Sequence, residues 1–591
     1  MNLSTLIDSL LSDTLQVSLP LFRPELALCV TMVLLLLVRV FRGGEYIPSF
    51  LLALGGAMVA LWLALPSEGL SSWAELERQE LFTGMLIHDT LTAYLRVFLM
   101  AFAVLFVILS RLTGIADRDD GQDYYTLVLG AILGMCIMAS ANHLLAVFMG
   151  IEMASVPSYV LAGIVKGRRR SSEAALKYAV YGAGTAGVML YGVSLLAGVL
   201  GSAHLPSMAR ELVALDIPSM IATGEEGSKL MVLALGGLML GVGLAFKLSA
   251  VPFHFWCPDV FEGASAEVGA FLSVASKAAA LTLLLRIGFG LTHLQEGPQE
   301  ALAALRPAVT AAALADFVSA EVDSDQTVAK PALRLNAVPL HIERMGAGRL
   351  TRNSTADNQL LSPVRNFFVM ILAIVAIVTC TFGNLAAYGQ TNIKRMLAYS
   401  TIAHAGYMMM AAAAAVALLG SNVAEAHSAV SALLFYVTIY LFMNLGAFAV
   451  IAFLRNAMRS EEIEDYAGLI RSCPVVAVMM TGILISLIGI PPMAGFWPKL
   501  RVMQALYEAG GTLMMVALVV AGLNTAISLV YYLRVVKTMC VDPEPDSRGP
   551  VSLGFLPVAY VLVVSLPVLI FGLLPDWLAV WADQAARQFF S

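Results

Sequence analysis

Long apolar runs recur along almost the whole chain. Stretches of 18 or more residues with few charges follow one another from Pro24 to Pro575. One helix needs about this length to cross the hydrocarbon core of a bilayer. Only 13% of the 591 residues are charged, compared with about 25% in soluble proteins. The chain is therefore predicted to be an all-α polytopic membrane protein embedded in a lipid bilayer.

The apolar runs predict about fourteen transmembrane helices of roughly 20 residues each. Their centres are expected near Leu34, Gly56, Phe102, Leu133, Val156, Val188, Leu238, Leu281, Ala376, Met408, Phe442, Gly482, Val520 and Val564. Alternate loops differ in basic residues: one set includes "KGRRR" at 166–170 and the Lys394-Arg395 pair, and the other set has few. Because basic loops stay on the cytoplasmic side, both termini are predicted on the opposite side.

Several classes of site are excluded by what the sequence lacks. The six cysteines are scattered singly without a CxxC pair, which fits neither an iron–sulfur cluster nor a zinc site. No GxGxxG fingerprint follows a strand, and no GxxxxGK[ST] loop is present, so a bound nucleotide is not expected. The net charge of −6 gives no sign of a nucleic-acid surface. We expect this chain to bind no metal or cofactor.

One segment differs from the rest in being long and polar. Residues 293–365 are predicted to form a surface insertion between the eighth and ninth helices. The Asn353-Ser354-Thr355 sequon inside it is interpreted as a chance match rather than a used glycosylation site.

Ionisable residues lie inside the apolar runs, although a lysine at the bilayer centre costs roughly 2.5–3.5 kcal/mol. A single lysine near a helix end can snorkel to the interface. Lys277 cannot, since about eight apolar or small residues flank it on each side. The series as a whole indicates a path for charge and consists of Glu152, Lys177, Lys247, His254, Lys277 and Lys499.

The residue types in this series favour protons over metal ions. A sodium or metal site would gather several carboxylates or carbonyl oxygens, whereas here one acid accompanies four lysines. Lysine in a low-dielectric site exchanges its proton more readily than lysine in water, and histidine titrates near neutral pH. Three further acids, Asp259, Glu262 and Glu267, are interpreted as helix-capping residues in a solvated turn.

Two of the apolar runs are interrupted by proline in a similar way. "SAVPFHFW" contains Pro252, "GIPPMAGFW" contains Pro491 and Pro492, and both end in Phe-Trp. Paired interruptions in two halves of a chain are typical of inverted-repeat transporters, whose functional sites lie at the breaks. The simpler alternative is that proline and glycine are common in membrane helices, so that Pro252 only ends a helix from which Lys247 snorkels.

Five motifs in order resemble the antiporter-like proton-pumping subunits of respiratory complex I: "FMGIEMASVPSYVLAG", "SEAALKYAVYGAG", "GLAFKLSAVPFHFWCPDVFEGA", "QTNIKRMLAYSTIAHAGYMM" and "GIPPMAGFWPK". Within this family the chain is most similar to the N branch, the equivalent of mitochondrial ND subunit 2. The eighth helix reads "ASKAAAL", where the L and M branches and the Mrp-type antiporters usually carry histidines. The resemblance implies N-terminal helices in 1–123, inverted five-helix repeats in 124–292 and 366–537, and a C-terminal helix in 538–591.

The resemblance also implies a role for each buried group. Glu152 and Lys247 would form an ion pair that gates the first half-channel, and Lys177 matches the lysine of the family's "ALKY" motif. His254 and Lys277 would carry the proton laterally, and Lys499 would govern the second half-channel.

By the same resemblance, the chain is expected to be the non-redox, proton-translocating membrane-arm subunit of an NADH:quinone oxidoreductase in a bacterial cytoplasmic membrane. NADH, flavin, iron–sulfur clusters and quinone would bind in partner subunits, and the neighbours would be the M and K subunits. Two alternatives remain open: an autonomous or Mrp-type cation/proton antiporter, and a structural scaffold with vestigial charges.

Overall fold

The computed structural model describes residues 3–40, 48–66, 76, 78–116, 121–224, 226–294, 358–545, 548–549 and 551–587. Its first half contains helices α1 (Leu3–Ser12), η1 (Asp13–Ser18), α2 (Leu19–Leu21), α3 (Arg23–Val40), α4 (Ser49–Ala64), α5 (Thr90–Thr113), α6 (Gly121–Ser140), α7 (Leu144–Ala162), α8 (Arg169–Leu200), α9 (Leu205–Ala214), α10 (Ile217–Thr223), α11 (Gly227–Leu248), α12 (Trp256–Gly263) and α13 (Ala266–Thr292). Its second half contains α16 (Ser362–Ala387), α17 (Ile393–Leu418), α18 (Val423–Met458), η4 (Ile463–Tyr466), α19 (Leu469–Ser472), α20 (Pro474–Ile488), α21 (Phe496–Ala509), α22 (Gly511–Cys540), α23 (Phe555–Leu573) and α24 (Asp576–Arg587). Residues 295–357, most of the predicted polar insertion, lie outside the described residues.

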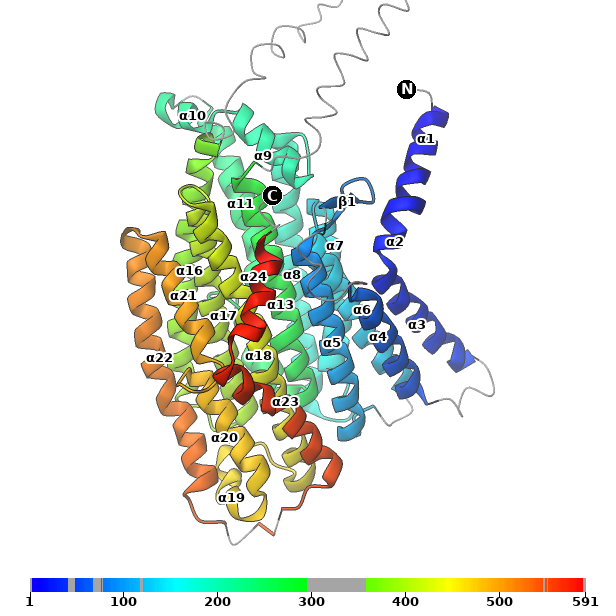
Figure 1. Cartoon of the computed structure of the whole chain (residues 1–591), viewed down its shortest axis with the longest axis vertical. Coiled ribbons are helices and arrows are strands. Elements are labelled where there is room, and N and C mark those ends of the chain that lie inside the picture. Colours follow the sequence, from blue (N-terminus) through cyan, green and yellow to red (C-terminus); the bar gives the residue numbers. More distant parts are fainter. Residues whose placement is uncertain are drawn as a thin grey trace, which may run out of the picture.

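The all-α membrane fold is confirmed. Each of the fourteen predicted centres lies within a helix, and the helices run roughly alongside one another (Figure 1). Among the described residues, 11 helices are long and apolar enough to cross a membrane. A twelfth span is added if Leu10–Leu21 and α3 are counted together as one span despite the 82° bend between them. Helices α4 and α20 are apolar but shorter. The number of crossings therefore stays a prediction.

Three helices form the centre of the bundle. The most apolar windows of α13, α17 and α18 are 100%, 94% and 89% buried, whereas those of α8 and α22 are 28% buried. Small residues allow this close packing: a Cβ added at Gly383 of α16 or Gly406 of α17 would lie 2.6 Å from backbone of the facing helix. Side chains on α13, α17 and α18 are thus shielded by protein on most sides, which makes these helices the place to look for buried chemistry.

The bundle has two chemically different ends. At one end, β1 (Gln79–Leu81) and β2 (Leu86–His88) form an antiparallel hairpin, and Asp89 caps α5 by accepting a hydrogen bond from the Thr92 N–H at 2.8 Å. We call this the hairpin end. At the opposite end lie Arg168, Lys394 and Arg455, and we call it the basic end.

Both proline-containing segments interrupt a helix. Helix α11 ends at Leu248 and α12 begins at Trp256, with Pro252 between them. Helix α20 ends at Ile488 and α21 begins at Phe496, with Pro491 and Pro492 between them. The tryptophan that follows each break is anchored by its indole N–H: Trp256 donates to the Phe246 carbonyl (3.0 Å) and Trp497 to the Gly572 carbonyl (2.8 Å).

Two buried ion pairs stabilise the hairpin end. Arg96 of α5 donates to Glu25 of α3 at 2.5 Å, and the guanidinium of Arg286 on α13 binds both carboxylate oxygens of Asp89 at 2.5 and 2.6 Å. Bidentate pairs of this kind fix geometry as well as charge. They tie α3 to α5, and α5 to α13. Neither pair was predicted, because the basic partner lies 71 or 197 residues further along the chain.

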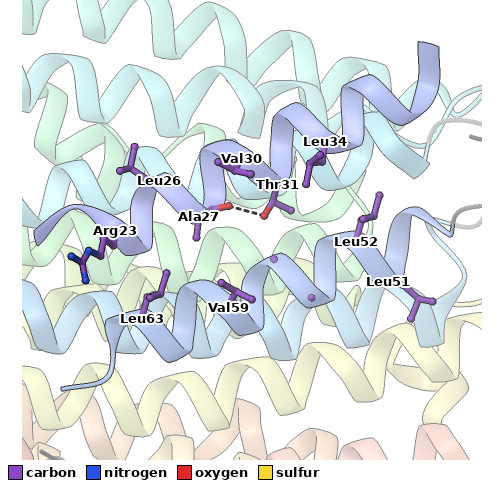
Figure 2. Close-up of a pocket in the computed structure, with 12 residues that line it drawn as sticks. Arg23, Leu26, Ala27, Val30, Thr31, Leu34, Leu51, Leu52, Val59 and Leu63 are labelled. Carbon is purple, nitrogen blue, oxygen red and sulfur yellow. Dashed lines mark hydrogen bonds between the residues drawn. The ribbon is translucent and has the colours of Figure 1, made fainter. Parts of the chain in front are cut away.

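An apolar groove of about 500 Å³ runs between α3 and α4 (Figure 2). Its polar lining residues are Arg23 at one end and Thr31, whose hydroxyl donates to the Ala27 carbonyl on its own helix at 2.7 Å. The groove therefore offers an apolar surface without a cluster of ionisable groups.

Candidate functional site: buried lysines and a histidine

Lys247 lies in the last turn of α11, directly before the break. Its side chain is 1% exposed, and its ammonium donates a hydrogen bond of 3.0 Å to the hydroxyl of Ser155 on α7. Glu152 lies three residues earlier on the same helix, so it shares a face of α7 with Ser155. The predicted ion pair between Glu152 and Lys247 is not formed between these two described residues, because the lysine takes the hydroxyl one turn away as its acceptor.

Lys277 lies in the middle of α13, the most buried helix. Its side chain is 3% exposed, and its ammonium donates to the backbone carbonyl of Thr401 on α17 at 3.2 Å. A carbonyl oxygen satisfies the ammonium without neutralising its charge, so this site stabilises the cation by a dipole only.

Lys499 occupies the first turn of α21, directly after the second break. Its ammonium donates to the carbonyls of Leu487 and Ile488 at 3.0 and 2.9 Å, and these are the last residues of α20. Free carbonyls at a helix C-terminus favour a positive charge. The ammonium also lies 4.7 Å from the ring centroid of Tyr407 on α17, a distance at which cation–π attraction contributes.

Gly489 makes this arrangement possible. Its φ of +89° lies in the region that only glycine adopts without strain, and a Cβ at this position would lie 2.9 Å from Cδ of Lys499. The glycine therefore ends α20 and leaves room for the lysine side chain.

His404 was not predicted, yet it lies between the two lysines. It is 2% exposed, its Nδ1 is 2.9 Å from the Tyr436 hydroxyl, and its Nε2 is 3.4 Å from the Tyr532 hydroxyl. On α17, Thr401 and His404 are three residues apart, and Tyr407 follows three residues later, so they share one face. Helix α17 thus presents, in order, the acceptor of Lys277, a histidine and the ring that contacts Lys499.

Hydroxyl and amide groups continue the polar surroundings of His404. Tyr532 also hydrogen-bonds to Ser400, and the amide of Asn444 donates to Tyr440 at 2.7 Å and to the Thr401 hydroxyl at 3.4 Å. A connected set of groups that can both donate and accept can pass protons and stabilise a transient charge. The sequence signal was present in "YSTIAHAGYMM", where His404 is the one residue of a type that, when unperturbed, titrates near neutral pH.

His254 lies in the first break, and its surroundings are largely apolar. Its ring centroid is 4.4 Å from that of Phe382 on α16, and its Nδ1 has no hydrogen-bond partner among the described side chains. In this structure it is therefore not hydrogen-bonded to Lys247 or to Lys277.

Lys177 belongs to a different cluster, at the basic end. Its ammonium pairs with Asp259 of α12 at 2.7 Å and with Glu173 of its own helix at 2.9 Å. Asp259 also accepts from Arg395 of α17 at 2.8 Å. Burial raises the pKa of Asp259, but the bonds from Lys177 and Arg395 lower it further than that, so the net shift is downward. Lys177 is thus tied to surface charges rather than to the buried lysines.

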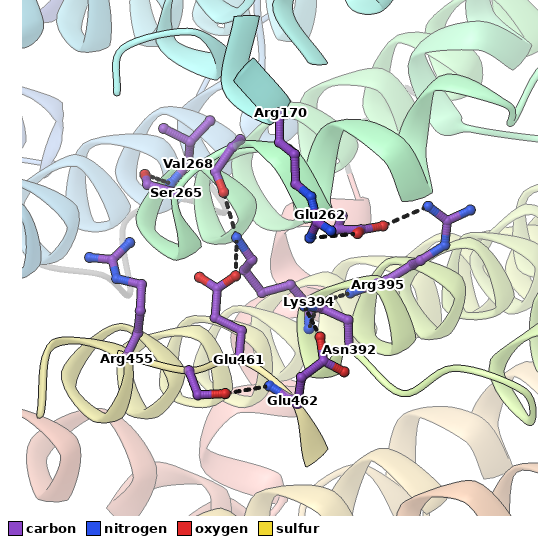
Figure 3. A network of polar contacts seen from close by, with 12 residues as sticks. Arg170, Glu262, Ser265, Val268, Asn392, Lys394, Arg395, Arg455, Glu461 and Glu462 are labelled. Carbon is purple, nitrogen blue, oxygen red and sulfur yellow. Dashed lines mark hydrogen bonds and ion pairs between the residues drawn. The ribbon is translucent and has the colours of Figure 1, made fainter. Parts of the chain in front are cut away.

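The same cluster joins the two halves of the chain (Figure 3). Glu262 pairs with Arg395 at 2.8 Å, and Lys394 pairs with Glu461 at 2.9 Å. Glu267 is fully buried and pairs with Arg455 of α18 at 3.1 Å. Asp259 and Glu267 lie in the first turns of α12 and α13, as a helix-capping role predicts, and Asp259 and Glu262 are partly exposed. The prediction of a solvated turn is wrong for Glu267, which is fully buried. Each has a basic partner from a distant helix, which the local sequence could not indicate.

The described residues contain no group of three or more His, Cys, Asp or Glu side chains placed so that they could bind a metal ion.

Comparison with known proteins assigns this arrangement to a family. The family described as NADH:quinone oxidoreductase/Mrp antiporter, transmembrane, matches residues 141–307 and 353–525. The chain belongs to this family. Its two matched regions contain every lysine discussed above as well as His254 and His404.

NADH-quinone oxidoreductase subunit N of Anaeromyxobacter sp. (strain Fw109-5) is 34% identical over 578 residues, which cover 96% of each chain. NADH-quinone oxidoreductase subunit N 2 of Sorangium cellulosum is 34% identical over 568 residues, 94% of each chain. Among solved structures, a chain of respiratory complex I from Thermus thermophilus with bound aureothin is 28% identical with a TM-score of 0.65, covering 95% of this chain and 99% of that one. A chain of the Mrp complex from Dietzia sp. DQ12-45-1b, 17% identical with a TM-score of 0.70 over 97% and 98% of the chains, shares the fold.

Proposed function

We propose that the chain is the proton-translocating membrane-arm subunit of an NADH:quinone oxidoreductase, moving protons while quinone is reduced elsewhere in the complex. The observation that carries this proposal is the face of α17 that links Lys277 to Lys499 through His404. Three buried basic groups whose partners among the described residues are carbonyls, hydroxyls and an aromatic ring are costly in a membrane. A protein that only needed stable helices would gain nothing from them.

In this proposal, protons enter from the basic end, which faces the cytoplasm of a bacterial cell. The excess of lysine and arginine in the loops of that end supports this orientation, and it places both termini on the non-cytoplasmic side. The two helix breaks then lie at the functional site of two inverted repeats, 124–292 and 366–537.

Lys247 acts as the gate of the first half by exchanging acceptors. Bonded to Ser155, it faces a neutral hydroxyl; bonded to Glu152, one turn away, it is held by a negative charge. The second state favours the ammonium and the first allows proton release toward the centre of the bundle. Moving one charge against 100 mV costs about 2.3 kcal/mol, which the coupled reaction elsewhere in the complex must supply.

Lys277, His404 and Lys499 carry the proton laterally in this scheme, and His254 joins the relay in a state in which its ring leaves Phe382. Lys177 takes part only when Asp259 releases it. In this proposal the chain works without a redox group of its own, and NADH, flavin, iron–sulfur clusters and quinone bind in partner subunits. The adjacent membrane subunits are M and K, and coupling to them is conformational or electrostatic.

Lys247→Met and Lys247→Arg test the proposal. Methionine has a similar length but cannot bind a proton, and a guanidinium does not release its proton in this range. In inverted membrane vesicles, NADH-driven proton pumping, normalised to assembled complex, should be lost in both variants. Wild-type pumping in both would refute the proposal and favour a scaffold. Sodium-dependent pH sensitivity of a strain lacking other antiporters would favour an autonomous antiporter instead.

A further inference from the structure

A second cavity, of about 180 Å³, opens at the basic end of the bundle. It is lined by the ends of α5 and α18, by Tyr124 of α6 and by the turn between α7 and α8. Its polar lining residues include Arg168, Arg455 and Asn456, and the Asn456 amide donates to the Thr113 carbonyl at 2.8 Å. A cavity with this many polar partners is suited to hold water.

Behind the lining lies a buried acid that the proposed relay does not use. Glu267, in the first turn of α13, is 0% exposed, and Arg455 holds its two carboxylate oxygens at 3.1 and 3.4 Å. Thr113, which lines the cavity, also interacts with this carboxylate. The same arginine therefore lines the cavity and binds the acid, so that it lies between the cavity and Glu267.

The two helices that carry Glu267 and Arg455 also reach the level of Lys277. Lys277 lies ten residues after Glu267 on α13, about 15 Å along the helix. On α18, Asn444 lies eleven residues before Arg455 and donates to the hydroxyl of Thr401, whose carbonyl accepts from Lys277. Both helices thus connect the cavity to the same level of the bundle.

Two aromatic rings fill the space between the level of Glu267 and the level of Lys277 in this structure. The ring of Phe448 on α18 packs directly on Gly269 of α13, where an added Cβ would lie 2.8 Å from it. Phe261 of α12 lies 5.8 Å from Phe448 between ring centroids. The two rings therefore lie between the level of Glu267 and the level of Lys277, as a gated inlet requires when it is closed.

We propose that Glu267 is the proton-loading group of the basic end, gated by Arg455 on the cavity side and by Phe448 on the inner side. When Arg455 swings into the cavity, the carboxylate takes a proton from cavity water and becomes a carboxylic acid. When Phe448 moves aside, that proton passes to the neutral amine of Lys277. The carboxylate is regenerated and binds Arg455 again. This inference rests on the proposed function.

The test separates proton loading from a structural ion pair. Glu267→Gln keeps the shape of the side chain but cannot cycle a proton in this way, and we expect NADH-driven pumping in inverted vesicles to fall roughly tenfold or more. Glu267→Asp keeps a carboxylate and should retain part of the pumping. Glu464→Gln, which removes an exposed acid of the same end, is the matched control and should pump like the wild type.

The double variant Glu267→Gln/Arg455→Gln distinguishes proton loading from a structural ion pair. It also replaces the single variant if Glu267→Gln alone fails to assemble, because it leaves no arginine without its carboxylate partner. If the pair is only structural, neutralising both partners restores pumping, which would overturn the inference. If Glu267 loads protons, pumping stays low although the complex assembles. Lys247→Met is measured in parallel: loss of pumping there with wild-type pumping in the double variant refutes this inference alone, whereas no loss in either refutes the proposed function.

Discussion

The ammonium of Lys247 lies 3.0 Å from the hydroxyl of Ser155, one helical turn from the carboxylate of Glu152. In the proposed scheme, two acceptors of different charge on one face of α7 give a single lysine two positions. The neutral acceptor matters in this scheme because its hydrogen bond stabilises the position of the lysine away from Glu152.

Removing the neutral acceptor should slow pumping without abolishing it. In Ser155→Ala the lysine is left with Glu152 as its nearby acceptor, so the ion-paired state is favoured. A lost hydrogen bond of about 1 kcal/mol corresponds to roughly a fivefold lower pumping rate, measured in inverted vesicles. Ser158→Ala is the control: its hydroxyl, one turn further, bonds to the Ala154 carbonyl at 2.6 Å and not to Lys247. Equal rates in the two variants would contradict the two-position scheme.

His404 should be required for transfer between the two halves. His404→Phe fills a similar volume but cannot exchange a proton, and we expect pumping to fall by about tenfold or more with normal assembly. Tyr436→Phe removes one partner of the imidazole and should have a smaller effect of a few-fold. Tyr560→Phe removes a buried hydroxyl that bonds to the Leu105 carbonyl, away from the lysines, and should leave pumping unchanged. A His404 variant with wild-type pumping would mean that protons bypass α17.

The fold and most of the buried groups could be predicted because charges stand out in apolar sequence. Each buried lysine can be identified from the sequence without knowing its partners, because a lysine is costly in hydrocarbon wherever it lies. This applies to Lys247, Lys277 and Lys499. Ser155 was not, because serine is common in membrane helices and its role depends on which lysine faces it.

The acid Glu267 was misassigned for a related reason. Its local sequence resembles a polar turn, and the arginine that buries it comes from a helix 188 residues further along the chain. Partners of this kind are set by helix packing and not by local pattern, so sequence alone identifies the ionisable groups but not how they are paired.

The stability of the hairpin end should depend on pH through His88. Burial, together with the nearby Arg96 guanidinium, lowers the pKa of His88 from 6.5 to about 4. The unfolded chain therefore binds a proton at this site at higher pH than the folded chain does, and stability rises with pH. The contribution, at most about 3 kcal/mol, is fully present above pH 6.5 and is lost as the pH falls toward 4.

The measurement compares the thermal midpoint of the detergent-solubilised protein from pH 7.5 to 4.5 in wild type and His88→Gln. The wild type should lose more stability than the variant across this range, because the variant lacks the titrating group. Parallel curves would show that His88 contributes nothing to the pH dependence.

The Asp89–Arg286 pair should be the most sensitive structural contact of the hairpin end. Burial raises the pKa of Asp89, but the Arg286 guanidinium and the Thr92 N–H lower it by more, to about 2, so the carboxylate stays ionised at every pH of physiological interest. Asp89→Asn leaves a buried guanidinium without its counter-charge, and such losses cost about 3–5 kcal/mol. The thermal midpoint of the assembled complex should therefore fall steeply, while the double variant Asp89→Asn/Arg286→Met should recover most of the loss because the buried Arg286 guanidinium is removed together with its counter-charge. Since α13 also carries Lys277, proton pumping in the double variant provides a second readout. Recovered stability with normal pumping means that the pair only holds α5 against α13, and a double variant as unstable as Asp89→Asn would show that the cost lies in packing rather than in the orphaned charge.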